Sequence, residues 1–352
     1  MNISTNSQVN IELNNQDDIR IPAEWEPHAA CLMAWAVPPE WQDWTTRVKD
    51  DLAIVIRTIS EFEPVWLLTS PECLADARAR FQGCQVEIIE APVADMWMRD
   101  SAPTFALRGQ ELVAIDWNPS DWGAAELRSG PTRGNAQGTV GSFSMVLSAI
   151  LNIPRLQAPF VAEGGALITD GQGTLVTTRS CLLNPNRNPP CAGPSRQSRI
   201  CEALRSFGIS KVIWLEGEPC EPITSGHVDG YVLFTSSGRL LVESVEDEQV
   251  EPPMWRAHDT RILQQSLDAQ GRNMQVERIR SPRKRHWKYR GDYWAPCYLN
   301  AYVANGAVIT GCFGDRERDQ ARASLCRAPF RNTGSLCFAL ITLRRGVEAF
   351  AA

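Results

Sequence analysis

The sequence predicts a mixed α/β fold built as one large domain. Short runs rich in aliphatic and β-branched residues, typical of strands, recur along the chain, and longer stretches with helical periodicity separate them. Strands that alternate with single helices are typical of α/β architecture. The 352 residues suffice for two ordinary domains, but no low-complexity linker divides residues 20–325, which favours one.

The individual elements follow from these patterns. We expect strands at residues 65–68, 86–89, 112–115, 174–177, 212–215, 231–234, 240–242 and 307–310. We expect helices at residues 47–62, 71–81, 140–151, 195–207, 259–269 and 315–325. Pro71 suits the first turn of its helix, and Asp259 and Asp315 are candidate N-caps. The sequence DGQG at 170–173 is typical of a hairpin turn between two strands.

Charge and apolar patterning argue against several classes of protein. The formal net charge is −6, and the isoelectric point is about 5.4. A mildly acidic surface attracts neither nucleic acid nor an anionic membrane, and it suits a small cationic substrate. No run approaches the roughly 20 apolar residues of a membrane span. The basic stretch at 278–290 is better interpreted as a solvated loop face than as a nucleic-acid site, given the acidic total.

The N-terminal residues and the cysteines favour a cytoplasmic protein. Residues 1–18 are polar, are rich in Asn and Gln and lack the apolar core of a signal peptide, so we expect a disordered arm. The eleven cysteines are scattered and odd in number, and they form no Cys-x-x-Cys pair. Free thiols in a reducing compartment are a better interpretation than disulfides or a structural zinc site.

Four histidines are present, and His227 stands out among them. It lies in TSGHVDG at 224–230, a turn that leads into an expected strand. In an extended segment residues i and i+2 project to the same side, so His227 and Asp229 would face one space. A proton-transferring imidazole beside a cation-binding carboxylate is a sensible arrangement for catalysis. Taken alone, such a pair is more often structural than functional.

Two further clusters carry charged groups next to turns. WMRD at 97–100 lies at an expected strand end that breaks at Pro103, where Arg99 and Asp100 are also able to form a simple salt bridge. EGG at 163–165 places a carboxylate before two glycines, which let the backbone approach a ligand closely. Neither signal is specific alone, because salt bridges at turns and glycine-rich turns are both common.

Seven segments together are more specific. They are IPAEWEPH at 21–28, WMRD at 97–100, EGG at 163–165, LLNPNRNP at 182–189, GHVD at 226–229, YLNAYVANG at 298–306 and FGD at 313–315. In content and order they resemble the agmatine deiminase and bacterial, Porphyromonas-type peptidylarginine deiminase family. The resemblance covers roughly residues 20–325.

The resemblance implies a fold and a reaction. The fold is of the pentein type, a five-bladed α/β propeller in which five ββαβ units surround a pseudo-fivefold axis and a central active-site channel. The reaction is hydrolysis of a guanidino group, with agmatine as the first candidate, giving N-carbamoylputrescine and ammonia in putrescine and polyamine biosynthesis. Peptidyl-arginine deimination and amidino transfer stay open as alternatives. No metal and no organic cofactor is implied.

The resemblance also implies roles for individual residues. Asp100 and Asp229 would clamp the planar guanidinium through paired, charge-assisted hydrogen bonds. A cysteine thiolate would attack its central carbon, and His227 would protonate the departing ammonia and then activate water. Glu163 would orient His227 or the substrate, and Trp97 would line the channel. These side chains should converge on one central cavity. Assembly of the protein into a homo-oligomer stays open.

The chain departs from the family near its C-terminal end. Family members carry a strand resembling Gly-Gly-Gly-Gly-Ile-His-Cys, whose cysteine is the nucleophile, whereas no cysteine follows Cys337 here. Cys337 has no glycine run beside it, and Cys297 and Cys312 are better interpreted as strand interior. Two function classes therefore stay open: a guanidino hydrolase and a catalytically inactive guanidino-binding pseudo-enzyme.

We divide the chain into an arm at 1–18, a deiminase domain at 19–326 and an aberrant tail at 327–352. We predict that a one-base frameshift starting near residues 327–329 produced the tail, because the codons of residues 346–349 all begin with G. The shifted frame permits Gly-Gly-Gly-Gly-Ile-Arg-Cys, one residue away from the family's nucleophile motif. A genuinely divergent tail is the alternative, and the third bases of the coding DNA distinguish the two.

Overall fold

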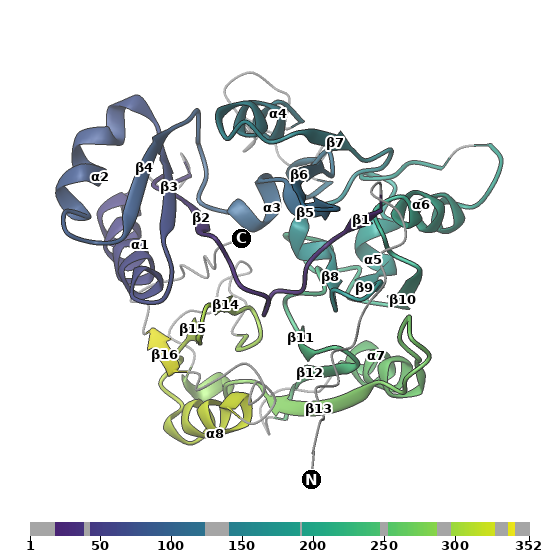
Figure 1. Cartoon of the computed structure of the whole chain (residues 1–352). Coiled ribbons are helices and arrows are strands. Elements are labelled where there is room, and N and C mark those ends of the chain that lie inside the picture. Colours follow the sequence, from purple (N-terminus) through teal and green to yellow (C-terminus); the bar gives the residue numbers. More distant parts are fainter. Residues whose placement is uncertain are drawn as a thin grey trace, which may run out of the picture.

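The computed structural model describes residues 18–38, 43–123, 141–190, 192–246, 253–286, 297–327 and 337–341. In these residues the strands form five separate sheets, one of four strands and four of three. Figure 1 shows the sheets spread around a common centre, with the longer helices on the outer side. The expected mixed α/β fold is confirmed.

The first three-stranded sheet in chain order is wholly parallel. It contains β2 (Cys31–Ala34), β3 (Val65–Thr69) and β4 (Val86–Glu90). Parallel neighbours need a crossover connection, which is usually a helix. The crossovers here are α1 (Thr45–Ser60), then η2 (Pro71–Cys73) together with α2 (Leu74–Arg80). Pro71 occupies the first turn of η2, as expected.

The other four sheets share one connection, in which an antiparallel strand pair is followed by a helix and a parallel strand. The four-stranded sheet contains β5 (Thr104–Arg108), β6 (Glu111–Asp116), α4 (Gly141–Ile150) and β7 (Arg155–Gln157), with β1 (Ile19–Arg20) paired to β5. The next contains β8 (Ile168–Thr169), β9 (Thr174–Thr178), α5 (Arg179–Leu182), α6 (Arg196–Arg205) and β10 (Lys211–Leu215). DGQG at 170–173 is the hairpin between β8 and β9, as expected.

The last two sheets repeat this order. One contains β11 (Val232–Ser236), β12 (Arg239–Ser244), α7 (Met254–Gln265) and β13 (Gln275–Arg280). The other contains β14 (Tyr302–Ala304), β15 (Ala307–Gly311), α8 (Arg316–Arg327) and β16 (Cys337–Ile341). Short helical turns are η3 (Asp121–Gly123), η4 (Gly164–Ala166) and η5 (Lys284–His286). The ββαβ order therefore occurs four times in the described residues.

Each expected strand has a counterpart, but the helix expected at 259–269 begins earlier, at Met254. Asp259 is therefore wrong as an N-cap, because it lies inside α7. Its buried carboxylate instead accepts hydrogen bonds from the amides of Glu216 and Gly217 and from the Tyr231 hydroxyl. Asp259 thus stabilises the loop that follows β10.

Two local expectations near the candidate residues are also wrong. The segment at 97–100 does not end a strand, since α3 (Met98–Ser101) is a one-turn helix. His227 and Asp229 do not lie in an extended segment but in turns that precede β11, which begins at Val232. The expected N-cap Asp315 does directly precede α8.

The helix α1 shows how the sequence positions a sheet. Its apolar residues recur at helical spacing and are fully or almost fully withdrawn from solvent: Val48, Leu52, Val55, Ile56 and Ile59. They pack in one cluster with β2 and β3. Burying each such side chain contributes roughly 1.5–3 kcal/mol, so this face is enough to fix the helix against the sheet.

The first and last sheets of the chain pack together. Tyr302 and Ile309 belong to the same apolar cluster as α1. Glu63, which follows α1 and is 2% exposed, accepts hydrogen bonds from the Tyr302 hydroxyl and, at 2.7 Å, from the Asn305 amide. Nδ1 of His28 lies 3.3 Å from the same carboxylate. This polar cluster joins the segment before β2 to the β14–β15 hairpin.

Parts of the chain divisions made above fall outside the described residues. The arm expected at 1–18 is described only at Asp18, and the tail expected at 327–352 only at 327 and 337–341. Residues 337–341 form β16, which pairs in parallel with β15. The disordered arm and the frameshift therefore stay predictions. Among the described helices, none has both the length and the apolar composition that a bilayer crossing requires.

The contact between His28 and Glu63 predicts a pH-dependent stability. Burial lowers the pKa of His28, but the hydrogen bond and charge of Glu63 outweigh it and raise that pKa above 6.5. Burial raises the pKa of Glu63, but hydrogen bonds from His28, Tyr302 and Asn305 lower it below 4.5. Protonated His28 stabilises the folded state fully below pH 6.5, and this stabilisation is lost as the pH rises through the raised pKa of His28. Ionised Glu63 also stabilises the folded state, and this stabilisation is lost as the pH falls below 4.5.

We therefore expect His28→Gln to reduce the free energy of unfolding most between these two values. The loss should be about 1–2 kcal/mol near pH 5.5 and smaller at about pH 9, measured by urea denaturation. His258→Gln, at an exposed position of α7, is the matched control and should change little. An equal loss of unfolding free energy in His28→Gln at both pH values would contradict a stabilising ion pair between His28 and Glu63.

Candidate active site

The four polar candidates come from three separate segments and meet in space. Asp100 lies in α3, Glu163 directly precedes η4, and His227 and Asp229 lie in the turns before β11. Nδ1 of His227 is 3.7 Å from Oδ1 of Asp100 and 4.0 Å from Oδ1 of Asp229. Its Nε2 is 3.2 Å from Oε2 of Glu163. The imidazole thus has one carboxylate on its Nε2 side and two on its Nδ1 side.

Gly165 lies at the point where these side chains converge. Its amide donates to Oδ1 of Asp100 at 3.0 Å, and its carbonyl accepts from the amide of Asp229 at 3.2 Å. A Cβ atom at this position would lie 2.5 Å from Asp229 Oδ2, 2.7 Å from His227 Nδ1 and 2.8 Å from Asp100 Oδ1. The second glycine of the EGG motif is therefore required because no side chain fits here, and only glycine allows this close approach of the backbone.

Asp100 is held at both carboxylate oxygens. Besides the Gly165 amide on Oδ1, the indole Nε1 of Trp122 donates to Oδ2 at 2.8 Å. Trp122 has a φ of 56°, in the left-handed region that non-glycine residues rarely adopt. A strained residue at such a contact suggests that the position of Asp100 matters for function. The Asp100 side chain is still 17% exposed, so the free lone pairs of the carboxylate are within reach of a ligand.

Glu163 forms a buried ion pair with Arg187. Nε of Arg187 donates to Oε2 of Glu163 at 2.7 Å, and the two side chains are 0% and 2% exposed. Arg187 is anchored in turn by a 2.8 Å hydrogen bond from Nη2 to the carbonyl of Thr224. Burial raises the pKa of Glu163, but Arg187 and His227 outweigh it and lower the value to about 2. Glu163 is therefore ionised at neutral pH.

The charges around His227 favour its protonated form. Burial lowers the pKa of His227, but the Asp100 carboxylate, the Cys181 thiol and Glu163 raise it well above 6.5. Burial raises the pKa of Asp229, and the neighbouring Asp100 charge acts in the same direction. A cationic ligand between Asp100 and Asp229 would relieve this repulsion between like charges.

Arg99 fixes the other side of Asp229. Its Nη1 donates to Oε1 of Glu24 at 2.7 Å, and its Nε lies 3.9 Å from Oδ2 of Asp229. The carbonyl of Arg99 also explains why residue 164 is glycine, because a Cβ atom there would lie 2.1 Å from the Arg99 oxygen. Arg99 thus forms a salt bridge as anticipated from WMRD, but its main partner is Glu24 in the IPAEWEPH segment rather than Asp100.

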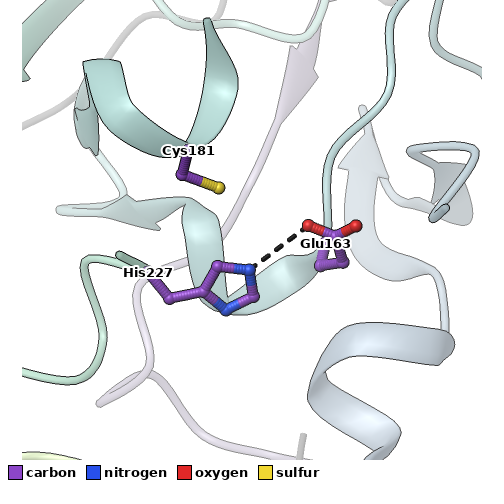
Figure 2. Close-up of side chains that lie close together, drawn as sticks. All are labelled: Glu163, Cys181 and His227. Carbon is purple, nitrogen blue, oxygen red and sulfur yellow. Dashed lines mark hydrogen bonds and ion pairs between the residues drawn. The ribbon is translucent and has the colours of Figure 1, made fainter. Parts of the chain in front are cut away.

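Cys181 lies beside the imidazole, as Figure 2 shows. It belongs to α5 and is fully buried. Its sulfur, a nitrogen of His227 and a carboxylate oxygen of Glu163 all lie within 4.8 Å of one another. In Figure 2 the thiol and Glu163 lie towards the same ring nitrogen of His227. The thiol is therefore placed away from Asp100 and Asp229.

Trp97 is partly buried and packs against the cluster built around α1. Its lining role stays a prediction. Sequence reasoning gave no role to Trp122, Arg187 or Cys181. A signal for Arg187 existed, because a carboxylate as buried as Glu163 needs a cationic partner and Arg187 is in the LLNPNRNP motif. No comparable sequence signal pointed to Trp122.

Comparisons with known proteins agree with this arrangement. Residues 20–334 match the family of Porphyromonas-type peptidyl-arginine deiminases. The agmatine deiminase of Pseudomonas aeruginosa (strain LESB58) is 31% identical over 88% of each chain, and that of Medicago truncatula is 32% identical over 85% of each. The chain belongs to this family. The resemblance noted in the sequence is thereby confirmed, and both enzyme names denote hydrolysis of a guanidino C–N bond.

Solved structures show that this member of the deiminase family has the family's fold. The agmatine deiminase of Enterococcus faecalis superposes with a TM-score of 0.79 at 24% identity, covering 96% of this chain and 94% of that one. A cysteine-to-serine variant of the C. jejuni agmatine deiminase with substrate bound gives a TM-score of 0.78 at 19% identity, covering 95% of each chain. A pentein-type α/β fold is therefore supported.

The packing at Gly165 predicts the outcome of two glycine substitutions. Gly165→Ala should destabilise this deiminase-family protein by about 1–3 kcal/mol, because the added methyl overlaps with Asp100, His227 and Asp229. Gly230→Ala is the matched control, since its Cβ would meet only the His227 carbonyl at 3.6 Å. Chemical denaturation of the two variants measures the difference. Similar stability of both would show that the described packing around Gly165 is wrong.

Proposed function

We propose that the site binds the guanidinium group of agmatine between Asp100 and Asp229 and is built to hydrolyse it to N-carbamoylputrescine and ammonia. The observation that carries this proposal is the pair of partly exposed carboxylates beside Nδ1 of His227. Two carboxylates match the planar donors of a guanidinium through charge-assisted hydrogen bonds. The agmatine deiminases among the relatives support agmatine over peptidyl-arginine.

The orientation of His227 assigns its two nitrogens different tasks in this proposal. Nε2 faces the ionised Glu163, which holds a proton on that nitrogen and fixes the ring. Nδ1 faces Asp100 and Asp229, where the guanidinium would lie. His227 would therefore protonate the departing ammonia from Nδ1 and afterwards accept a proton from the attacking water at the same atom.

The nucleophile in this proposal is a cysteine thiolate that attacks the guanidinium carbon and leaves a thiouronium, which water hydrolyses. Cys181 does not suit that task, because Figure 2 places its thiol towards the ring nitrogen that faces Glu163. The glycine-rich segment that should carry the nucleophile is missing from the sequence after Cys337. A guanidino-binding protein without turnover is the second candidate function.

The fold supports the same proposal at a larger scale. Four ββαβ units and one parallel sheet lie around a common centre, and the first and last sheets pack together. We propose that these units form the five blades of a pentein propeller. The candidate residues would then lie at its axis, because α3, η4 and the turns before β11 come from consecutive units.

Ammonia release from agmatine tests the function. We expect the 352-residue chain to show little or no release, and the frame-restored chain ending in the glycine-rich cysteine motif to show robust release. Loss of a covalent nucleophile typically costs about 10⁶-fold in kcat. Replacing the restored cysteine by serine is the control and should abolish release again. Rapid ammonia formation by the present chain would contradict the claim that it lacks the nucleophile. An inactive restored chain would contradict the proposed reaction.

A further inference from the structure

Three side chains that can bind a metal lie close together around Nε2 of His227. They are Glu163, Cys181 and His227, all buried, with one potential ligand atom each and all three atoms within 4.8 Å of one another. Figure 2 shows them arriving from three different segments. The proposed deimination uses Glu163 and His227 but gives Cys181 no task. A thiol at this place therefore calls for a chemical explanation of its own.

The spacing of His227 and Glu163 fits a small tetrahedral cation, and Cys181 lies close to both. Zn²⁺ binds imidazole nitrogen and carboxylate oxygen at about 2.0–2.2 Å, which places two such ligands about 3.4 Å apart on a tetrahedron. Nε2 of His227 and Oε2 of Glu163 are 3.2 Å apart, close to this separation, so a small reorientation of the two side chains would let them share one ion. The sulfur of Cys181 would be the third ligand, which leaves one position open.

The surroundings resemble the outer shell of a metal site. Ligating carboxylates are generally hydrogen-bonded themselves, and Glu163 accepts from Nε of Arg187 at 2.7 Å. A ligating histidine usually has a carboxylate at its other ring nitrogen, and Oδ1 of Asp100 lies 3.7 Å from Nδ1 of His227. Glu163 would thus be oriented before an ion arrives, and Asp100 is near enough to act on the other nitrogen of His227.

We infer that Glu163, Cys181 and His227 form a binding site for one Zn²⁺ ion. A set of thiolate, imidazole and carboxylate favours zinc over the hard cations Mg²⁺ and Ca²⁺. Zn²⁺ binding would displace the proton of the Cys181 thiol and any proton on Nε2 of His227, so that a thiolate and an unprotonated nitrogen face the ion.

The site has a consequence for the chemistry proposed above. A bound ion would occupy Nε2 of His227 and take Glu163 as a ligand, so the imidazole could no longer gain and lose the catalytic proton. Zinc would therefore be a reversible inhibitor of an active form of this protein. The binding itself does not depend on turnover, so it can be measured on the present chain.

Cobalt titration tests the site, because Co²⁺ replaces Zn²⁺ and reports a thiolate ligand by a charge-transfer absorption in the near ultraviolet. The full chain, kept reduced, should develop this absorption at one equivalent, and Zn²⁺ should displace it. Cys181→Ser should abolish the absorption and weaken Zn²⁺ binding by more than about 100-fold, since loss of an outer-shell partner alone costs about 10–100-fold. A chelator competition measures the Zn²⁺ affinity.

The matched control is Cys220→Ser, which removes an exposed thiol. It should keep both the absorption and the Zn²⁺ affinity. Cys181→Ala guards against a folding defect, because both Cys181 variants should keep the circular dichroism of the parent while losing the absorption. An absorption that survives in Cys181→Ser, disappears in Cys220→Ser or never forms would overturn the proposed site. None of these outcomes depends on deimination.

Discussion

Glu163 and Arg187 form a buried ion pair on which the geometry of the site depends. Both side chains are almost completely withdrawn from solvent, where an unpaired charge is strongly unfavourable. Removing one partner of such a pair typically costs roughly 3–5 kcal/mol. Because Arg187 keeps the Glu163 carboxylate ionised, that carboxylate can hold Nε2 of His227 and leave Nδ1 directed at Asp100 and Asp229.

The groups that hold a ligand in this account come from very short segments. Asp100 lies in a one-turn helix, and His227 and Asp229 lie in turns. Such segments are positioned by their contacts rather than by their own hydrogen-bond ladders. Here the contacts pass through Gly165, whose amide and carbonyl join Asp100 to Asp229. The absence of a side chain at this residue therefore contributes as much to the site as the charged residues do.

Sequence patterns predicted the elements that depend on local apolar periodicity. The strands and α1 were located because burial of one face leaves a regular trace in the sequence. The start of α7 was not located correctly, because N-capping preference is a local signal. The carboxylate of Asp259 instead accepts hydrogen bonds from the loop that follows β10. The same reason explains α3, whose Asp100 is held by Gly165 and Trp122, both distant in sequence.

The candidate site was predictable only in part. The family motifs named Asp100, Glu163, His227 and Asp229, which the structure brings together. The motifs gave no role to Arg187 or Trp122, because their roles follow from which buried carboxylate each one meets. Nor could they place Cys181, since its distance from His227 depends on how α5 packs against the turns before β11.

Calorimetric binding of agmatine tests the central claim, that Asp100 and Asp229 hold a guanidinium, without requiring turnover. The present chain should bind agmatine and should bind a diamine of similar length, which lacks the guanidino group, much more weakly. Asp100→Asn should reduce the agmatine affinity at least about 10-fold, because a charge-assisted hydrogen bond contributes about 1.5–3 kcal/mol. Asp43→Asn, at an exposed position before α1, should not change it. Equal affinity of the parent and Asp100→Asn for agmatine would contradict the account.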